Sequence, residues 1–252
     1  MKIKILNKNE LDLLFFHIRL EGWNLEEAHF KTLYKVKPND FFIAFKDDKL
    51  VGFILAIKHS NKFGMISTFL ILKEYRSLGF GKTLFQYALA HLKGCQIALD
   101  SIIGYENFYK KFNFKEYFDV YTYKYITDSL KVKNKNIKIY NFNEKLSLKN
   151  KNEYQKIILK DKNIKYKELR QKNTTTSFAY ILPFNDGYKI TIEAHDINEA
   201  ISLFLELAKE VNIKSNIYIE VSKLSPMLMD VTKVLDMKIE SQLLRMYNKI
   251  LK

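Results

Sequence analysis

Short apolar runs bounded by polar turn residues stand out in the first part of the chain. Three of them follow one another at residues 41–45, 50–58 and 65–72, with short polar connectors between them. Runs of this length predict β-strands, and connectors of turn composition predict hairpins. We therefore predict an antiparallel meander of three strands.

A helical pattern follows the third strand. Apolar residues recur at helical spacing over residues 84–92, directly after a turn that contains Gly79 and Gly81. A strand that leads through a glycine turn into a helix directs several backbone N–H groups toward one point, where the helix dipole adds positive potential. Glycine has no Cβ atom, so the backbone can approach a ligand closely. The turn is therefore a candidate phosphate-binding site.

The elements around this turn complete a mixed pattern. We predict a strand over 2–6, helices over 9–20 and 25–35, a strand over 96–99, a helix over 106–112 and an alternating strand over 115–126. Strands and helices in this order predict an α/β fold, an α+β mixed sheet with helices packed against it.

A similar order of elements returns later in the chain. We predict a helix over 151–172, strands over 178–182 and 188–194, a helix over 197–211, a strand over 216–221, a helix over 226–235 and a strand over 238–247. The predicted domains are therefore residues 1–128 and 151–252, joined by a Lys/Asn-rich connector of residues 129–150. The alternative is a coincidence, because this order of elements is common.

The glycine turn carries a more specific motif. Residues 76–81 read Arg-Ser-Leu-Gly-Phe-Gly, and residues 108–114 read Phe-Tyr-Lys-Lys-Phe-Asn-Phe. They resemble the R/Q-x-x-G-x-G/A loop and the FYEKxGF segment of the GNAT superfamily of acyl-CoA-dependent N-acetyltransferases. The Walker and Rossmann phosphate-binding patterns both fail here. The resemblance covers the predicted first domain and implies the GNAT acyl-CoA N-acyltransferase fold.

The second domain is interpreted as a smaller, degenerate GNAT-like copy. Residues 21–24, Glu-Gly-Trp-Asn, resemble a signature of a bacterial branch whose members carry such a C-terminal domain. Residues 193–196 stand in place of the glycine turn, and their acidic side chains would repel a pyrophosphate. Thr232 stands at the position that matches Tyr109. We therefore expect this copy to pack on the first and to lack its chemistry.

The resemblance implies acetyl-CoA as co-substrate. In the family, main-chain groups of the strand before the loop pair with the pantetheine arm and polarise the acetyl carbonyl, and the loop amides hold the pyrophosphate. The matching strand residues here are Phe69, Leu70 and Ile71, and the matching loop residues are Arg76, Ser77, Leu78, Gly79, Phe80, Gly81 and Lys82. Core packing is the alternative role for the strand residues, and main-chain contacts allow both roles.

Tyr109 is the candidate general acid, since a phenol near the coenzyme's sulfur can protonate the departing thiolate. Asn113 replaces the family's glycine in the following turn, and Asn tolerates the left-handed backbone conformation required there. The candidate general bases are Glu21 and Asp100, each with a solvated or capping carboxylate as the alternative. Either carboxylate could also bind a cationic acceptor, and Trp23 could line the acceptor pocket or belong to the core.

Charge and composition narrow the classes of function. The net charge is +14, and residues 131–172 hold 13 Lys and 1 Arg against 4 acidic residues. A general Lys/Asn bias explains this as well as a binding surface does, and no aromatic–basic interleaving typical of single-strand binders is found. Nucleic-acid binding is therefore not expected, although the positive field would attract an anionic coenzyme.

Cysteine and histidine usage favours a metal-free protein of a reducing compartment. Cys95 is the only cysteine, so an intramolecular disulfide is excluded, and the five histidines show no metal-ligand spacing. No run approaches the roughly 18 apolar residues of a membrane helix. The sequence predicts a cytoplasmic protein with no membrane partner and no metal.

The predicted function is transfer of the acetyl group of acetyl-CoA to a primary amine, by direct attack in a ternary complex. The alternative is a non-catalytic GNAT-like module that binds an acyl-CoA or another ligand. The acceptor stays open among small amines, amino acids, peptide N-termini and protein lysines. The oligomeric state is open as well, a homodimer being one alternative.

Overall fold

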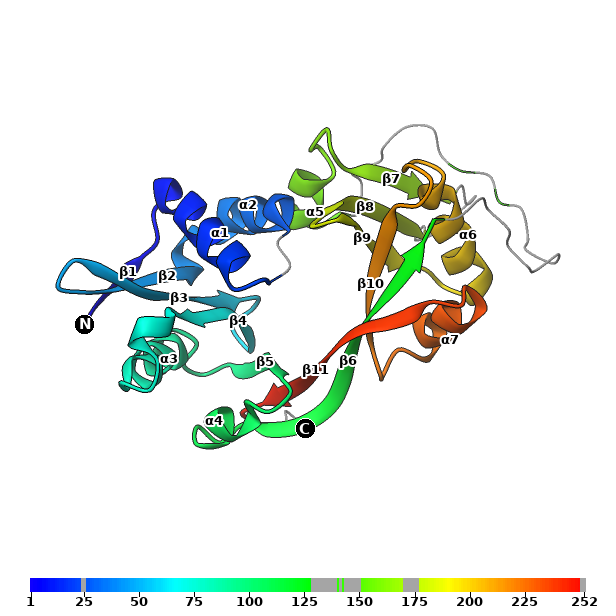
Figure 1. The fold of residues 1–252 in the computed structure, drawn as a ribbon. Helices are drawn as coiled ribbons and strands as arrows, with labels where there is room; N and C mark the ends of the chain where they lie inside the picture. Colours follow the sequence, from blue (N-terminus) through cyan, green and yellow to red (C-terminus); the bar gives the residue numbers. More distant parts are fainter. Residues whose placement is uncertain (24–25, 128–139, 141, 143–150, 170–176, 250–252) are drawn as a thin grey trace. The chain divides into compact units, whose positions relative to one another are not determined.

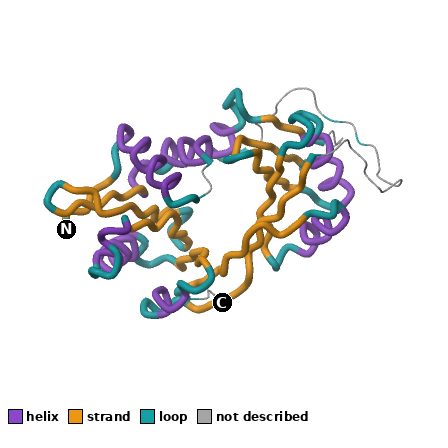
Figure 2. Tube along the Cα trace, in the orientation of Figure 1, coloured by secondary structure: helices purple, strands orange, loops and turns teal. Residues whose placement is uncertain are grey.

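The computed structural model describes residues 1–23, 26–127, 140, 142, 151–169 and 177–249 (Figures 1 and 2). The chain forms two compact units. The first unit comprises Met1–Trp23, Leu33–Asp119 and Leu243–Lys252, and the second comprises Asn24–Thr32 and Val120–Gln242. Each unit therefore includes segments that are distant in the sequence.

The first unit is built on a mixed sheet. Its strands are β1 (Lys2–Ile5), β2 (Phe41–Lys46), β3 (Lys49–Lys58), β4 (Phe63–Ile71), β5 (Gln96–Ile102) and the end of β11 (Lys238–Tyr247), in the order β1-β2-β3-β4-β5-β11. The β2–β3–β4 meander is antiparallel, as predicted. β4 and β5 are parallel, and β11 closes the sheet antiparallel to β5.

Helices cover both faces of this sheet, since strand side chains alternate between faces. Phe42 and Ile54 pack in one hydrophobic cluster with the buried face of α3 (Phe80–His91). Phe53 points to the opposite face, where its ring lies 6.0 Å from that of His17 in α1 (Leu11–Leu20). α1 and α3 accordingly lie on opposite sides of the strands in Figure 1.

The helix starts differ in detail from the prediction. The helix predicted over 9–20 is preceded by a capping box of Asn7 and Glu10, and a 3-10 turn over Lys8–Glu10 leads into α1. The helix predicted over 25–35 is α2, which runs from Glu27 to Val36. Short 3-10 turns also span Pro38–Asp40 and Lys73–Tyr75, and α4 spans Glu106–Lys110.

The described part of the second unit contains five adjacent strands. Its strands are β6 (Lys115–Ile126), β7 (Lys165–Glu168), β8 (Phe178–Phe184), β9 (Gly187–Glu193) and β10 (Asn216–Ser222), in the order β6-β10-β9-β8-β7. Its helices are α5 (Glu153–Ile158), α6 (Ile197–Ala208) and α7 (Pro226–Val234). The buried face of α6 supplies much of the hydrophobic core, with Leu203, Phe204 and Leu207 fully buried.

One predicted helix of this unit is wrong. The sequence predicts a helix over 151–172, but α5 ends at Ile158 and residues 165–168 form β7. The Asp161 carboxylate accepts a hydrogen bond from the Asn163 backbone N–H, an Asx turn that ends the helical path. The alternating segment that follows pairs with β8 instead.

The order strand–strand–helix–strand–helix–strand occurs in both halves, as predicted. The closing strands, however, are exchanged. β6 follows α4, but its residues 120–126 pair with β10 in the second unit. β11 follows α7, but Leu243–Tyr247 pair with β5 in the first unit. The linear domain boundaries given above stay a prediction.

A partly buried histidine in the second unit lies within a polar cluster. His29 Nδ1 is 2.7 Å from the Tyr154 hydroxyl, and the Lys189 ammonium is 2.7 Å from Glu26 and 3.2 Å from Glu220. Burial lowers the pKa of His29, an effect that the Glu26 carboxylate opposes only in part. His29 is therefore neutral in the folded protein at neutral pH.

This shift predicts a pH-dependent stability. The folded pKa lies below the unfolded one, so the stabilising contribution is present above about pH 6.5 and is lost as the pH falls through the folded pKa. The loss has a slope of at most about 1.4 kcal/mol per pH unit. We expect denaturant unfolding to show this loss in the wild type and a flatter profile in His29→Gln. His195→Gln, at an exposed histidine of the same unit, should keep the wild-type profile; identical profiles for all three proteins would contradict the assignment.

No helix in the described part of the chain has the length and apolar character needed to cross a membrane.

Candidate active site

The end of β4 is irregular where it approaches the glycine turn. Ser67 pairs with Leu55 and Leu70 pairs with Phe53, so two β4 residues, Thr68 and Phe69, face a single residue of β3. This is a β-bulge, which leaves one residue out of the hydrogen-bonded ladder. Thr68 has φ +47°, an uncommon and strained conformation for a β-branched residue. Such strain concentrates at functional sites.

β4 and β5 separate at the same level. Their parallel pairing covers only four residue pairs and stops at Ile66 and Leu99. β4 continues to Ile71, while the rest of β5 pairs with β11 on its other side. We call this point of divergence the β4–β5 fork. The edge of β4 over residues 67–71 therefore faces the fork with main-chain groups that β5 does not pair.

The glycine turn after β4 opens α3 without a side-chain cap. Gly79 is the N-cap with φ +83°, and Ser77 also lies in the left-handed region with φ +62°. The first N–H groups of a helix have no intrahelical acceptor. No acidic residue occupies the first turn of α3, and Lys82 is exposed there. The amides of Phe80, Gly81 and Lys82 are thus available to an anion.

Gly79 and Gly81 have different structural roles in the turn. Gly79 needs its positive φ, and a Cβ atom there would meet no atom within 4 Å. At Gly81 a Cβ atom would lie 3.4 Å from the Phe69 ring and 3.5 Å from the Ile71 side chain, which is ordinary contact. Gly79 therefore sets the backbone path, whereas Gly81 lies against the Phe69 and Ile71 side chains of β4.

Arg76 joins the loop to two neighbouring segments. Its Nε donates a hydrogen bond to the Ile71 carbonyl at 2.8 Å, and its Nη2 lies 2.7 Å from Glu21 Oε1. Glu21 directly follows α1 and is only 15% exposed. The motif's first residue thus fixes the start of the loop relative to β4 and holds the carboxylate that sequence analysis proposed as a base. Trp23, two residues later, is half-buried.

Tyr109 lies on α4, within the aromatic cluster on the α3 side of the sheet. Its ring centroid is 5.5 Å from that of Phe85 and 5.2 Å from that of Phe108. Phe69, at the bulge, is 5.6 Å from Phe108. Burial raises the pKa of Tyr109 to about 12, so its phenol stays protonated at neutral pH. A proton donor is therefore packed in the same cluster as the bulge residue.

The turn after Tyr109 confirms the left-handed backbone conformation predicted for Asn113. Asn113 has φ +65°, and the Phe114 N–H donates to the Tyr109 carbonyl at 3.3 Å. Asn thus adopts the left-handed conformation that glycine supplies in the family segment.

Asp100 lies one residue beyond the last β4–β5 pair, at the fork. Its two carboxylate oxygens accept hydrogen bonds from Arg245 Nε and, at 2.8 Å, Arg245 Nη2. The guanidinium carbon of Arg245 also lies 5.7 Å from the Phe118 ring centroid. Sequence analysis missed Arg245, because a lone Arg in a strand 145 residues from its partner gives no local signal. The carboxylate of Asp100 is thereby held in place.

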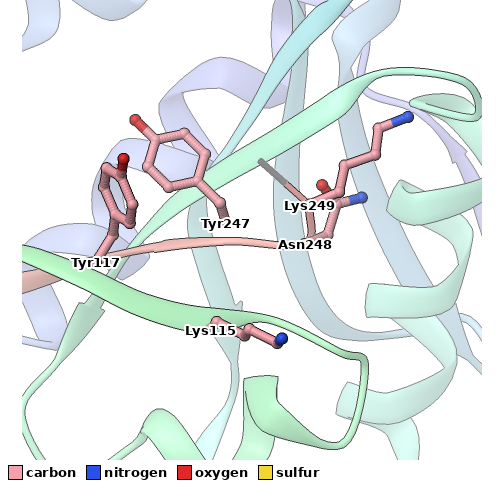
Figure 3. A pocket seen from close by; sticks show the side chains of 5 residues that line it. All are labelled: Lys115, Tyr117, Tyr247, Asn248 and Lys249. Carbon is pink, nitrogen blue, oxygen red and sulfur yellow. The ribbon is translucent and has the colours of Figure 1, made fainter. Parts of the chain in front are cut away.

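A shallow pocket lies next to this pair. It is lined by Lys115, Tyr117, Tyr247, Asn248 and Lys249. Figure 3 shows the two phenol rings side by side, with the Lys115 side chain directed away from them. The Tyr117 and Tyr247 rings meet edge to face at 5.3 Å. Tyr247 lies two residues after Arg245 on β11, so the two side chains project from the same face of the sheet.

Comparisons with known proteins agree with this geometry. Residues 9–114 match the model of the acetyltransferase (GNAT) family. This segment, which is less than half of the chain, is similar to that family. It contains α1, the β2–β4 meander, the glycine turn, α3, β5 and α4.

Solved structures show the same fold over nearly the whole chain. A candidate acetyltransferase from Pyrococcus horikoshii superposes with a TM-score of 0.73 at 16% identity, covering 98% of this chain and 88% of that one. A GCN5-related N-acetyltransferase from Anabaena variabilis gives 0.55 at 15% identity, covering 98% and 72%. One from Kribbella flavida gives 0.55 at 13% identity, covering 98% and 71%. The sequence has no significant match among curated proteins. The predicted GNAT-type fold is thus confirmed.

The second unit repeats the fork but not the open helix end of the first unit. β9 and β10 pair in parallel over four residue pairs and stop at Ile190 and Ile219. Here the carboxylate of Asp196 caps α6, accepting hydrogen bonds from the backbone N–H groups of Asn198 at 2.8 Å and Glu199 at 2.9 Å. The chain's own carboxylate thus occupies the anion position of this helix start.

His17 is a further residue of the first unit that was not predicted as a site residue from the sequence. Burial lowers its pKa, and the Glu74 and Glu21 carboxylates oppose this effect. Its helical position among apolar residues is indistinguishable in sequence from that of a core histidine. The described residues contain no group of three or more His, Cys, Asp or Glu side chains that could hold a metal ion.

Proposed function

We propose that the chain is an acetyl-CoA-dependent N-acetyltransferase. The observation that supports this most directly is the combination of the β4 bulge, the β4–β5 fork and the uncapped start of α3 in one continuous segment. The fork offers main-chain groups of Phe69, Leu70 and Ile71 to an extended arm. The loop from Arg76 to Lys82 offers amides to a diphosphate. Coenzyme A has an extended pantetheine arm followed by a diphosphate, in the same order as the fork and the loop.

The chemistry needs alignment and electrostatic stabilisation rather than a covalent intermediate. The neutral amine nitrogen attacks the thioester carbon, the carbon–sulfur bond breaks, and the amine loses a proton. A main-chain N–H at the bulge stabilises the oxyanion. Tyr109, which is protonated and packed near the bulge residue Phe69, supplies the proton for the departing thiolate.

The test has two stages. Calorimetric titration with acetyl-CoA measures binding, and a free-thiol assay with small amines, amino acids, peptide N-termini and lysine peptides measures transfer. We expect saturable binding and thiol release with at least one acceptor class. Binding without thiol release would favour the non-catalytic acyl-CoA module. Absence of binding would contradict both.

Tyr109→Phe is the matched test of the general acid, because it keeps the packed ring and removes only the hydroxyl. Loss of the proton donor should lower kcat by about 100-fold and leave the KM for acetyl-CoA unchanged. Steady-state thiol release measures both parameters. The control is the double variant Phe108→Tyr/Tyr109→Phe, which places a hydroxyl on the neighbouring ring. It should remain as slow as Tyr109→Phe alone. An unchanged kcat in Tyr109→Phe would remove Tyr109 from the mechanism.

The second unit is proposed to be a degenerate GNAT-like domain of the bacterial two-domain branch. The capping of α6 by Asp196 supports the view that it does not take a second coenzyme. The acceptor is proposed to be a small-molecule or peptide amine. The location is proposed to be cytoplasmic, and a homodimer is one assembly that sizing with light scattering would detect.

A further inference from the structure

The sheet of the first unit has two chemically distinct faces at the fork. Leu99 and Met246 pair with each other and pack in the α3 cluster. Because side chains alternate along strands, the neighbouring pair Asp100 and Arg245 faces the opposite side. Phe53, which contacts His17, also faces that side. The proton donor Tyr109 thus lies on the α3 side, and a set of titratable groups lies on the α1 side.

Two members of that set are already bonded. Both carboxylate oxygens of Asp100 accept hydrogen bonds from Arg245, and Glu21 is paired with Arg76. Adding a proton to either carboxylate would weaken its bond to a guanidinium. Neither group is well suited to collect a proton during turnover.

His17 differs from them in being unbonded. Within the described part of the chain its ring forms neither a hydrogen bond nor an ion pair. Its ring centroid lies 5.2 Å from that of Phe16 and 6.0 Å from that of Phe53. Phe53 pairs with Leu70, the residue directly after the bulge. The imidazole is thus half-buried over β3, next to the strand position at which the bulge ends.

The charges around His17 suit a base that works at neutral pH. Burial lowers its pKa, which keeps the imidazole neutral and its lone pair free. The facing groups are Glu74 in the 3-10 turn after β4 and Glu21 after α1, and both favour the protonated form once it appears. Arg76 forms an ion pair with Glu21, and its positive charge offsets part of that carboxylate's field. The partner residue from β3, Phe53, is apolar.

We propose that His17 is the general base of the acetyl transfer, taking the proton from the acceptor nitrogen on the sheet face opposite Tyr109. This inference rests on the proposed function. The electron pair of the broken nitrogen–hydrogen bond stays on the nitrogen. The nitrogen forms the new bond to the acetyl carbon. The proton goes to the imidazole, and the imidazolium later releases it to solvent. The sulfur leaves with the pair of the broken carbon–sulfur bond and takes its proton from Tyr109.

The test compares thiol release from acetyl-CoA over pH 5 to 9 in the wild type and His17→Gln. The acceptor is water or whichever amine of the panel gives the highest rate. We expect His17→Gln to lower kcat by about 100-fold with unchanged acetyl-CoA affinity in calorimetry. In the wild type the rate should rise as His17 loses its proton, with a midpoint below about pH 6.5. His17→Gln should lack this rise.

Two further variants separate a base from a structural residue. Glu74→Gln removes a carboxylate that raises the pKa of His17, so the midpoint should move to lower pH. If the rate instead rose because the acceptor amine lost its proton, the midpoint of the profile would be the same in Glu74→Gln as in the wild type. His59→Gln is the matched control, because burial also lowers the pKa of His59 but its ring stacks on Phe63 at the start of β4. It should behave as the wild type does.

The outcomes distinguish this inference from the function on which it rests. If the wild type neither binds acetyl-CoA nor releases thiol, the proposed function fails and the inference fails with it. If the wild type is active and His17→Gln keeps both its rate and its pH profile, only the assignment of His17 is overturned. A wild-type midpoint that Glu74→Gln leaves in place would overturn it as well.

Discussion

Gly79→Val is expected to reduce the affinity for acetyl-CoA by at least about 100-fold, or about 2.8 kcal/mol, while the protein stays folded. Gly79 holds φ +83°, and a side chain with a Cβ atom resists this conformation by roughly 1–2 kcal/mol. The surrounding space is open, so the protein has room for the added atoms. A bound diphosphate would need that same space, and relief of the strain would turn the amides of α3 away from it. Calorimetric titration measures the loss.

Gly94→Val is the matched control for backbone strain. Gly94 has φ +90°, also has no atom within 4 Å of an added Cβ, and lies beyond the other end of α3. Both variants should show a similar decrease in thermal stability, but Gly94→Val should bind acetyl-CoA as the wild type does. Normal binding by Gly79→Val, or equal loss in both variants, would refute the role of the glycine turn.

Phe85→Ala should have the largest effect on stability, about 3–5 kcal/mol. Phe85 is fully buried in α3. Its ring contacts those of Phe69, Phe108, Tyr109, Phe112 and Phe114. Truncation leaves a cavity that these neighbours cannot all fill, and it removes the packing that positions Tyr109. Denaturant unfolding followed by near-ultraviolet circular dichroism reports the loss of stability in the first unit.

The comparison variant is Phe16→Ala, in which the same atoms are removed from a ring that is 53% exposed. Its unfolding midpoint should change little, since surface substitutions usually alter stability by less than about 0.5 kcal/mol. A similar decrease in both variants would mean that the aromatic cluster is not the centre of this core.

The parts of the site that depend on neighbouring residues were predictable from the sequence. The glycine turn, the start of α3 and the left-handed Asn113 all follow from local backbone preferences. The antiparallel meander follows from short apolar runs and hairpin connectors. In each case the residue that determines the conformation stands within a few positions of the structure it determines.

The parts that depend on distant pairing were not predictable. The Asp100–Arg245 pair joins strands 145 residues apart, and the exchange of β6 and β11 is invisible to any local pattern. The bulge at Thr68 departs from the usual preference of a β-branched residue, so the sequence argues against it. The helix predicted over 151–172 is wrong for a local reason. The alternating residues of β7 have the two-residue period of a strand, and they were assigned to a helix.

The exchange of closing strands has a consequence for synthesis on the ribosome. The segment that matches the family model ends at residue 114, yet β5 obtains its outer partner from Leu243–Tyr247. Long-range strand pairing is slow because the loop entropy is lost before the contacts form. The nascent chain must therefore hold an unpaired edge of β5 until residues 243–247 emerge, and premature termination before them would expose that edge to aggregation.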